Sequence, residues 1–211
     1  MTISRESGGT WNSRKPTRLR IDVTRPGAPA ARILGLDPGS RHTGYGFIEK
    51  AGSSLIYLES GILSPPGRAE LPQRLQFLHQ GVSELMARLT PDMVAVEDIF
   101  HAANVRSVLK LAHARGVLIL AAVQAGVPVS EYSPASVKKT VVGVGAADKM
   151  RVAWMVARLL PGAPAEIGHD ASDALAVALC HAAHLRQNRI VAAVSASGSG
   201  KGNWPGRGRN P

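Results

Sequence analysis

Cysteine is almost absent from the chain, which has only Cys180 among its 211 residues. A single cysteine excludes an intrachain disulfide and a cysteine-rich zinc cluster, and it is consistent with a reducing cytoplasm. Long apolar runs are also missing, because the longest, such as residues 117–123, fall far short of the roughly 20 residues that a bilayer requires. The N-terminus lacks the apolar stretch of a secretory signal. We therefore expect a cytoplasmic protein with no membrane span.

Aromatic residues are scarce too, at 4% of the chain, whereas apolar residues make up 45%. Leucine, valine, isoleucine and alanine must therefore fill the core of a globular protein. A length of 211 residues fits one domain with flanking segments better than two catalytic units. Gly143-Val-Gly145 lacks the Lys-Ser/Thr ending of a phosphate-binding loop, so we expect no bound nucleotide.

Positive charge is abundant and lies mainly at the two ends of the chain, which has a net charge of +10. Residues 1–32 contain seven Lys/Arg and two acids, and residues 186–211 contain five Lys/Arg and no acid. Such basic tails favour binding to phosphate backbones but identify no site. Their Gly, Ser and Pro content predicts a disordered N-terminal extension at 1–32 and a disordered tail at 189–211. The folded domain is expected at 33–188.

Hydrophobic periodicity predicts five strands and four helices within this domain. The strands are expected at residues 32–37, 43–49, 55–63, 93–96 and 127–132. The helices are expected at residues 71–89, 104–125, 147–160 and 171–186. An antiparallel meander followed by alternating helices and strands predicts an α/β fold, with a mixed five-stranded sheet and helices on both faces. Four further side chains have core spacing and are expected to pack inside, namely Met150, Trp154, Met155 and Cys180.

Two acidic residues come at the ends of predicted strands. Asp37 ends the first strand just before a Pro-Gly turn, so its carboxylate should face a cleft; an Asx-type turn is the alternative. Glu97 follows the fourth strand, and its neighbour Asp98 must point to the opposite side because successive side chains alternate. For Glu97 the alternative is a solvated strand end. A sheet of the predicted kind brings both positions to one rim.

A second acidic pair, Asp170 and Asp173, shares one face at the start of the last helix. Such acids are usually helix caps, but the apolar run at 174–179 places this pair at the edge of a buried surface. If this pair converges with Asp37 and Glu97, the four carboxylates would repel one another unless cations lie between them. Oxygen ligands suit Mg²⁺ or Mn²⁺, and a pair of ions about 4 Å apart clamps the attacking and leaving oxygens in phosphoryl transfer. We therefore expect two Mg²⁺ ions per site, with Mn²⁺ able to substitute.

Four motifs follow one another along the predicted domain. They are ILGLDPGSRHTGYG at 33–46, VAVE at 94–97 with Phe100, VKKTVVGVG at 137–145, and DASDALA at 170–176. Together these motifs resemble the RuvC family of Holliday junction resolvases. The resemblance implies a ribonuclease H-like fold, a homodimer, and RuvA and RuvB as partners. It also implies symmetric, Mg²⁺-dependent nicking of four-way DNA junctions in recombination and repair, which leaves 5′-phosphate and 3′-hydroxyl ends.

The resemblance also assigns roles to individual residues. The family's catalytic and metal-binding acids fall on the four carboxylates already selected, Asp37, Glu97, Asp170 and Asp173. Its basic residues near the site fall on Lys138 and Lys149, for which a solvated loop is the alternative. Phe100 is expected to wedge the junction or stack on a base, with core packing as the alternative. The helix after it adds three expected DNA contacts, Asn104, Arg106 and Lys110. His169 is assigned to solvent or helix capping.

Two other classes of protein share parts of this pattern. A sugar kinase or actin-like ATPase also opens with a Leu-Asp-Pro-Gly turn, but it needs two such domains and a chain about twice as long. A non-catalytic DNA-binding protein would explain the basic tails, yet it has no use for four convergent acids.

Overall fold

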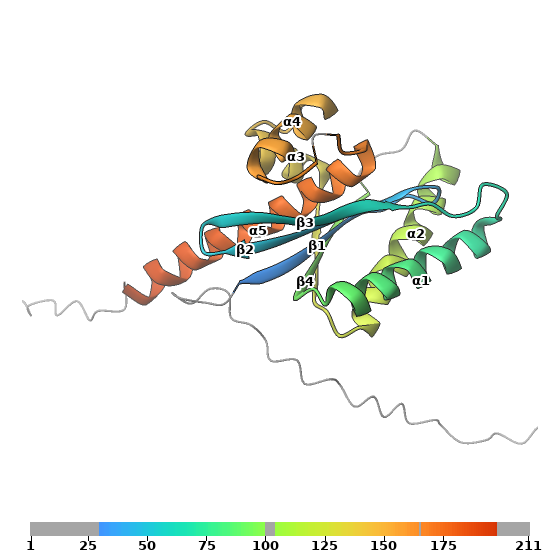
Figure 1. Ribbon diagram of the computed structural model, residues 1–211, viewed down its shortest axis with the longest axis horizontal. Helices are drawn as coiled ribbons and strands as arrows, with labels where there is room; N and C mark the ends of the chain where they lie inside the picture. The colour runs from blue at the N-terminus through green and yellow to red at the C-terminus, as the bar shows by residue number, and fades with distance from the viewer. Residues whose placement is uncertain (1–29, 100–103, 165, 198–211) are drawn as a thin grey trace, which may run out of the picture.

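Five strands form one mixed sheet that carries helices on both faces (Figure 1). The computed structural model describes residues 30–99, 104–164 and 166–197. The strands are β1 (Ala31–Asp37), β2 (Thr43–Ala51), β3 (Ser54–Leu63), β4 (Met93–Glu97) and β5 (Val129–Tyr132). The helices are α1 (Leu71–Leu89), α2 (Val105–Gln124), α3 (Pro134–Val142), α4 (Lys149–Leu159) and α5 (His169–Ser197).

The sheet has the strand order β3-β2-β1-β4-β5. Strands β1, β2 and β3 form the predicted antiparallel meander, while β4 pairs in parallel with both β1 and β5. The parallel pairing follows from the two helical crossovers, because a helix must carry the chain back across the sheet before the next parallel strand. The α/β class, the mixed sheet and the helices on both faces are confirmed.

Alternating side chains along β1 divide the core into two layers. Ile33 packs in the layer beneath α3, α4 and α5, whereas Leu34 and Leu36 pack in the layer beneath α1 and α2. Because side chains alternate along a strand, odd-numbered residues of β1 face α5 and even-numbered residues face α1 and α2. All three side chains are fully buried, so this register is fixed by the burial of apolar surface.

Helix α5 lies directly on the meander, as Figure 1 shows. Glycines of the sheet permit this contact: a Cβ on Gly35 would lie 2.1 Å from the carbonyl oxygen of Ala174. A Cβ on Gly44 would lie 1.9 Å from the carbonyl oxygen of Asp170. Real Cβ atoms do not approach backbone oxygens so closely, so main chain packs on main chain here. The height of α5 above the strand ends is thereby fixed.

One helix was missing from the sequence-based prediction. Helix α3 begins after Ser133, whose hydroxyl accepts the Ser136 amide, and Pro134 occupies its first turn. It ends at Gly143, whose φ of 86° lies in the left-handed region that glycine favours. The sequence signals for this helix are its Ser-Pro start and its glycine end. Its nine residues are rich in β-branched side chains, which have low helix propensity, so the helix was not predicted.

The last two helices also depart from prediction. Helix α5 runs to Ser197, past the expected end at residue 186, so the expected domain boundary at 188 falls inside a helix. Cys180 is fully buried as expected. Met150 and Trp154, however, are 79% and 60% exposed, so their expected place in the core is wrong. The reason is that α4 buries only one side, the one that includes Val152, and leaves the opposite side to solvent.

Helix α2 alone among the described helices is long and apolar enough to cross a membrane, judged by length and composition only. One such helix is weak evidence, because helices of soluble proteins pass the same test. Its apolar residues serve two sides: Leu118 is buried against the sheet layer, whereas Val105 and Val123 are 75% and 59% exposed. The outer side of α2 is therefore an apolar surface within the described residues.

Candidate active site

The first two predicted acids lie side by side on the α5 face of the sheet. Leu36 of β1 is in register with Val96 of β4, so the next residues along, Asp37 and Glu97, end two adjacent parallel strands. Both are odd-numbered positions and share the α5 face with Ile33 and Ala95. Their carboxyl groups share a hydrogen bond.

The second acidic pair reaches the same place from the first turns of α5. The close contact at Gly44, which is the register partner of Asp37, lies against the backbone of Asp170. Asp173 accepts a hydrogen bond of 3.1 Å from the Lys149 ammonium at the start of α4. Residues from β1, β4, α4 and α5 therefore meet at one rim of the sheet.

Electrostatics show that these charges act on one another. Burial, and then the charges of Glu97, Asp173 and Asp170, raises the pKa of Asp37 to about 8. Burial and Asp173 also raise the pKa of Glu97, against the hydrogen bond from Asp37 and the positive charge of Lys149. The contact with Asp173 in turn raises the pKa of Lys149. The cluster therefore holds more negative charge than its surroundings neutralise, which favours binding of a proton or another cation.

The donor set fits hard divalent cations, because all four acidic groups offer only oxygen. Among the described residues, no three His, Cys, Asp or Glu side chains are grouped tightly enough to hold an ion as they stand. The Asp37–Glu97 hydrogen bond and the Lys149–Asp173 pair occupy several of these oxygens. Binding of an ion would therefore replace a shared proton and loosen the contact with lysine.

The predicted DNA contacts lie at different places in the structure. Lys138 is half-buried and its charge lowers the pKa of Glu97, so it lies within electrostatic range of the carboxylates. Arg106 and Lys110 are exposed on α2. Asn104 is the N-cap of α2, because its side chain accepts the Arg106 amide at 2.8 Å. Phe100 lies outside the described residues.

Sequence reasoning missed Arg115, which lies on the opposite face of the sheet below this rim. Its guanidinium contacts Asp98 and Glu131, and its Nε donates to the main-chain oxygen of Glu97. The alternation of side chains had placed Asp98 on this face. The partner from α2, however, cannot be identified without knowing which helix covers the strand end. His169, by contrast, is exposed at the first position of α5, as expected.

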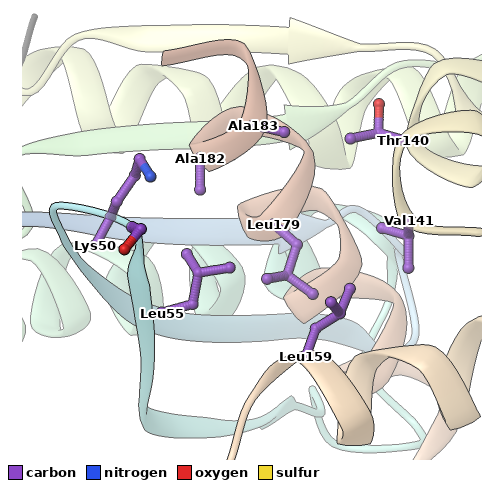
Figure 2. Close-up of a pocket in the computed structure, with 9 residues that line it drawn as sticks. Lys50, Leu55, Thr140, Val141, Leu159, Leu179, Ala182 and Ala183 are labelled. Atoms are coloured by element: carbon purple, nitrogen blue, oxygen red, sulfur yellow. The ribbon is translucent and has the colours of Figure 1, made fainter. Parts of the chain in front are cut away.

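A separate cavity of about 180 Å³ lies further along α5, between that helix and the β2–β3 hairpin. Figure 2 shows Leu55 of β3, Leu159 of α4 and Leu179 of α5 pointing into it. None of the acidic residues lines this cavity. It is a mostly apolar cavity with Lys50 among its lining residues, and it is separate from the acidic site.

Residues 33–181, which include all four acids, match the family described as "Crossover junction endodeoxyribonuclease RuvC". A protein of that name from Maricaulis maris is 49% identical over 166 residues, covering 79% of this chain and 99% of the relative. Another from Azorhizobium caulinodans is 51% identical over 153 residues, covering 72% of this chain and 90% of the relative.

Solved structures show a similar fold. Thermus thermophilus RuvC in complex with a Holliday junction substrate is 33% identical and superposes with a TM-score of 0.70. The match covers 75% of this chain and 97% of that chain. The yeast mitochondrial Holliday junction resolvase shares the fold at 19% identity and a TM-score of 0.58.

Proposed function

Because the chain belongs to the RuvC family of crossover junction endodeoxyribonucleases, and is a Holliday junction resolvase, we propose that Asp37, Glu97, Asp170 and Asp173 form its catalytic site. The observation that carries the assignment is the convergence of these carboxylates at one rim, where burial, and then the charges of Glu97, Asp173 and Asp170, raises the pKa of Asp37 to about 8. Acids brought from three distant segments to one rim, at such electrostatic cost, are typical of functional sites.

The family's nucleases depend on metal ions, and we assign two Mg²⁺ ions to this cluster, for which Mn²⁺ can substitute. Asp37 and an acid of α5 would hold one ion, and Asp37 and Glu97 the other. When bound, such a pair activates the attacking water and stabilises charge on the departing oxygen. The products would be 5′-phosphate and 3′-hydroxyl ends, which a ligase can reseal.

Side chains of this protein would position the metal ions and the phosphate for this reaction. Asp37 is the central group, because all three other acids act on it. Lys149 holds Asp173 and keeps a positive charge beside the cluster, where it would face the scissile phosphate. Lys138 would contact the same strand from α3. Positive groups at this rim position the phosphate backbone and do not select a sequence.

The remaining DNA contacts are assigned to the start of α2 and the segment before it. Arg106 and Lys110 are exposed and would contact phosphates of the junction arms. Asn104 caps the helix that presents them. Phe100 is proposed to wedge or stack at the branch point.

We also propose that the protein is a homodimer through the exposed apolar stripe of α2. The stripe has the three- and four-residue spacing of a helix–helix seam and comprises Val105, Leu109, Ala112, Gly116, Leu120 and Val123. A twofold interface is the commonest kind, and it would supply two sites for the two equivalent strands of a four-way junction. The same stripe accounts for the hydropathy of α2 without a membrane.

Partners and location follow from the substrate. RuvA and RuvB are proposed partners on family resemblance alone. A cytoplasmic location is proposed because the protein acts on DNA.

The direct test replaces Asp37 with asparagine, which keeps the size of the side chain and removes its charge. D37N should bind a synthetic four-way junction like the wild type but cut it at least about 100-fold more slowly with Mg²⁺, because a metal-bridging group is lost. Asp92→Asn is the matched control, since Asp92 accepts the Arg32 amide at the opposite end of the sheet. Linear duplex and RNA/DNA hybrid serve as substrate controls. A D37N protein that cuts at a near wild-type rate would refute the assignment.

A further inference from the structure

The guanidinium of Arg115 joins three elements beneath the acidic rim. Its Nη2 lies 3.3 Å from Asp98 and also contacts Glu131 of β5, and its Nε donates to the Glu97 carbonyl oxygen at 3.3 Å. The Arg115 side chain is only 17% exposed, although it is charged. It therefore lies between α2 and the sheet, where its Nη2 and Nε have partners.

Its partners sit where the alternation of side chains requires. Odd-numbered Glu97 points to the α5 face, so Asp98 must point to the α2 face. Val129 packs on the α2 side, which places Glu131 of the same strand there too. Glu97 thus presents its carboxylate to the α5 face, while its main-chain oxygen and the side chain of Asp98, the residue after β4, contact the guanidinium of Arg115.

These contacts hold the main chain at the point where β4 ends. Besides Arg115, the Asp98 carboxylate accepts the Ile99 amide at 2.8 Å. The Asp98 amide donates to the Tyr132 carbonyl oxygen at 2.8 Å. Only one residue, Ile99, separates this anchor from position 100. Without the guanidinium, the exit from β4 would keep the backbone bond from Asp98 to Tyr132 and lose these polar contacts with α2.

We propose that Arg115 is a positioning residue for Glu97, which fixes the main chain at the end of β4 so that the Glu97 carboxylate meets Asp37. This inference rests on the proposed role of Glu97 in catalysis. A planar guanidinium suits the task, because it can bond a carbonyl oxygen and two carboxylates at once in a fixed geometry. Since α2 also carries the apolar stripe, the same side chain links the proposed dimer helix to the active site.

Substitution of Arg115 is expected to slow the cleavage step itself and to leave junction binding almost unchanged. A misplacement of about 1 Å in a catalytic group costs on the order of 100-fold in rate, so Arg115→Met should slow cleavage by about 10- to 100-fold. Affinity for the junction should change by no more than about twofold, because Arg115 faces away from the acidic rim. A higher Mg²⁺ concentration should recover part of the rate, because a displaced ligand weakens metal binding and does not abolish it.

The experiment compares R115M, Arg115→Lys and Glu131→Gln with the wild type. Single-turnover cleavage is measured against Mg²⁺ concentration, Mn²⁺ binding without DNA by calorimetry, and stability by thermal unfolding. R115K should be intermediate, because an ammonium can still bond the carbonyl but cannot bridge all three partners. E131Q should show a smaller loss in the same direction. Arg88→Met is the matched control, since Arg88 pairs with Glu59 at the surface, away from the rim.

The outcomes separate the two proposals. If the wild type cuts junctions and D37N does not, the proposed site stands whatever Arg115 does. If R115M then cuts and binds Mn²⁺ like the wild type, or if its rate falls with no change in metal dependence, the positioning role is wrong. Should R115M fail to fold, E131Q decides: weakened Mn²⁺ binding at an unchanged melting temperature supports the role, and unchanged binding overturns it.

Discussion

Replacing Asp37 with asparagine should stabilise the metal-free protein while it removes activity. The pKa of Asp37 rises from its ordinary value of 3.8 to about 8, chiefly through burial and then through the charge of Glu97. Each unit of pKa corresponds to about 1.4 kcal/mol, so at neutral pH the raised pKa costs the folded state up to about 4 kcal/mol. Relaxation of the neighbouring charges reduces this cost, and we expect D37N to gain about 2–4 kcal/mol.

The direction of the pH dependence follows from the raised pKa. Below pH 4 the group is protonated in both the folded and unfolded states and costs nothing. Between pH 4 and 8 the unfolded chain ionises while the folded protein keeps its proton, so the stability of the metal-free wild type should fall as the pH rises. D37N lacks this titration and should show a flatter profile.

Thermal unfolding in EDTA across pH 5–8 measures both effects. For a domain of this size, 1 kcal/mol shifts the melting temperature by about 2–4 °C, so D37N should melt roughly 4–16 °C above the wild type near neutral pH. Added Mg²⁺ should raise the melting temperature of the wild type more than that of D37N, because binding to the folded state stabilises it. The reasoning fails if D37N melts at or below the wild type in EDTA, or if the difference does not shrink toward pH 5.

Two further predictions concern the contact between α5 and the glycines of the sheet, and the exposed apolar side of α2. Gly44→Ala should cost about 1–3 kcal/mol in urea unfolding, because its Cβ would lie 1.9 Å from the Asp170 oxygen, and it should slow cleavage at least tenfold. Gly67→Ala, where a Cβ meets nothing within 4 Å, should leave both unchanged. Leu120→Glu should convert a dimer to a monomer in sedimentation, whereas Leu58→Glu on β3 should not. A wild-type protein that stays monomeric at micromolar concentration with junction DNA would contradict the dimer.

The four acidic positions could be selected from the sequence because each is marked by local signals. Asp37 and Glu97 end apolar strands, and Asp170 and Asp173 open an apolar helix. Strand ends and helix starts are visible in a one-dimensional pattern, and parallel pairing then brings them to one rim. The meander and the mixed sheet were predictable for the same reason.

Other features depend on contacts that no local pattern encodes. Helix α3 is short and rich in β-branched residues, so its capping signals outweigh its propensity. Trp154 has core spacing, but only one side of α4 is covered, and which side depends on α5. Arg115 is one of many arginines in the chain, and only the placement of α2 under β4 and β5 gives it partners.

The contact of α5 with glycines of the sheet also affects how much the distances between the acidic residues change with temperature. Side chains change rotamer on fast timescales, and a helix resting on them would shift as they do. Where Gly35 and Gly44 meet α5, the touching surfaces are backbone, which has no rotamers to exchange. The separation between acids on the strands and acids on the helix should therefore vary little with warming, until the helix itself detaches.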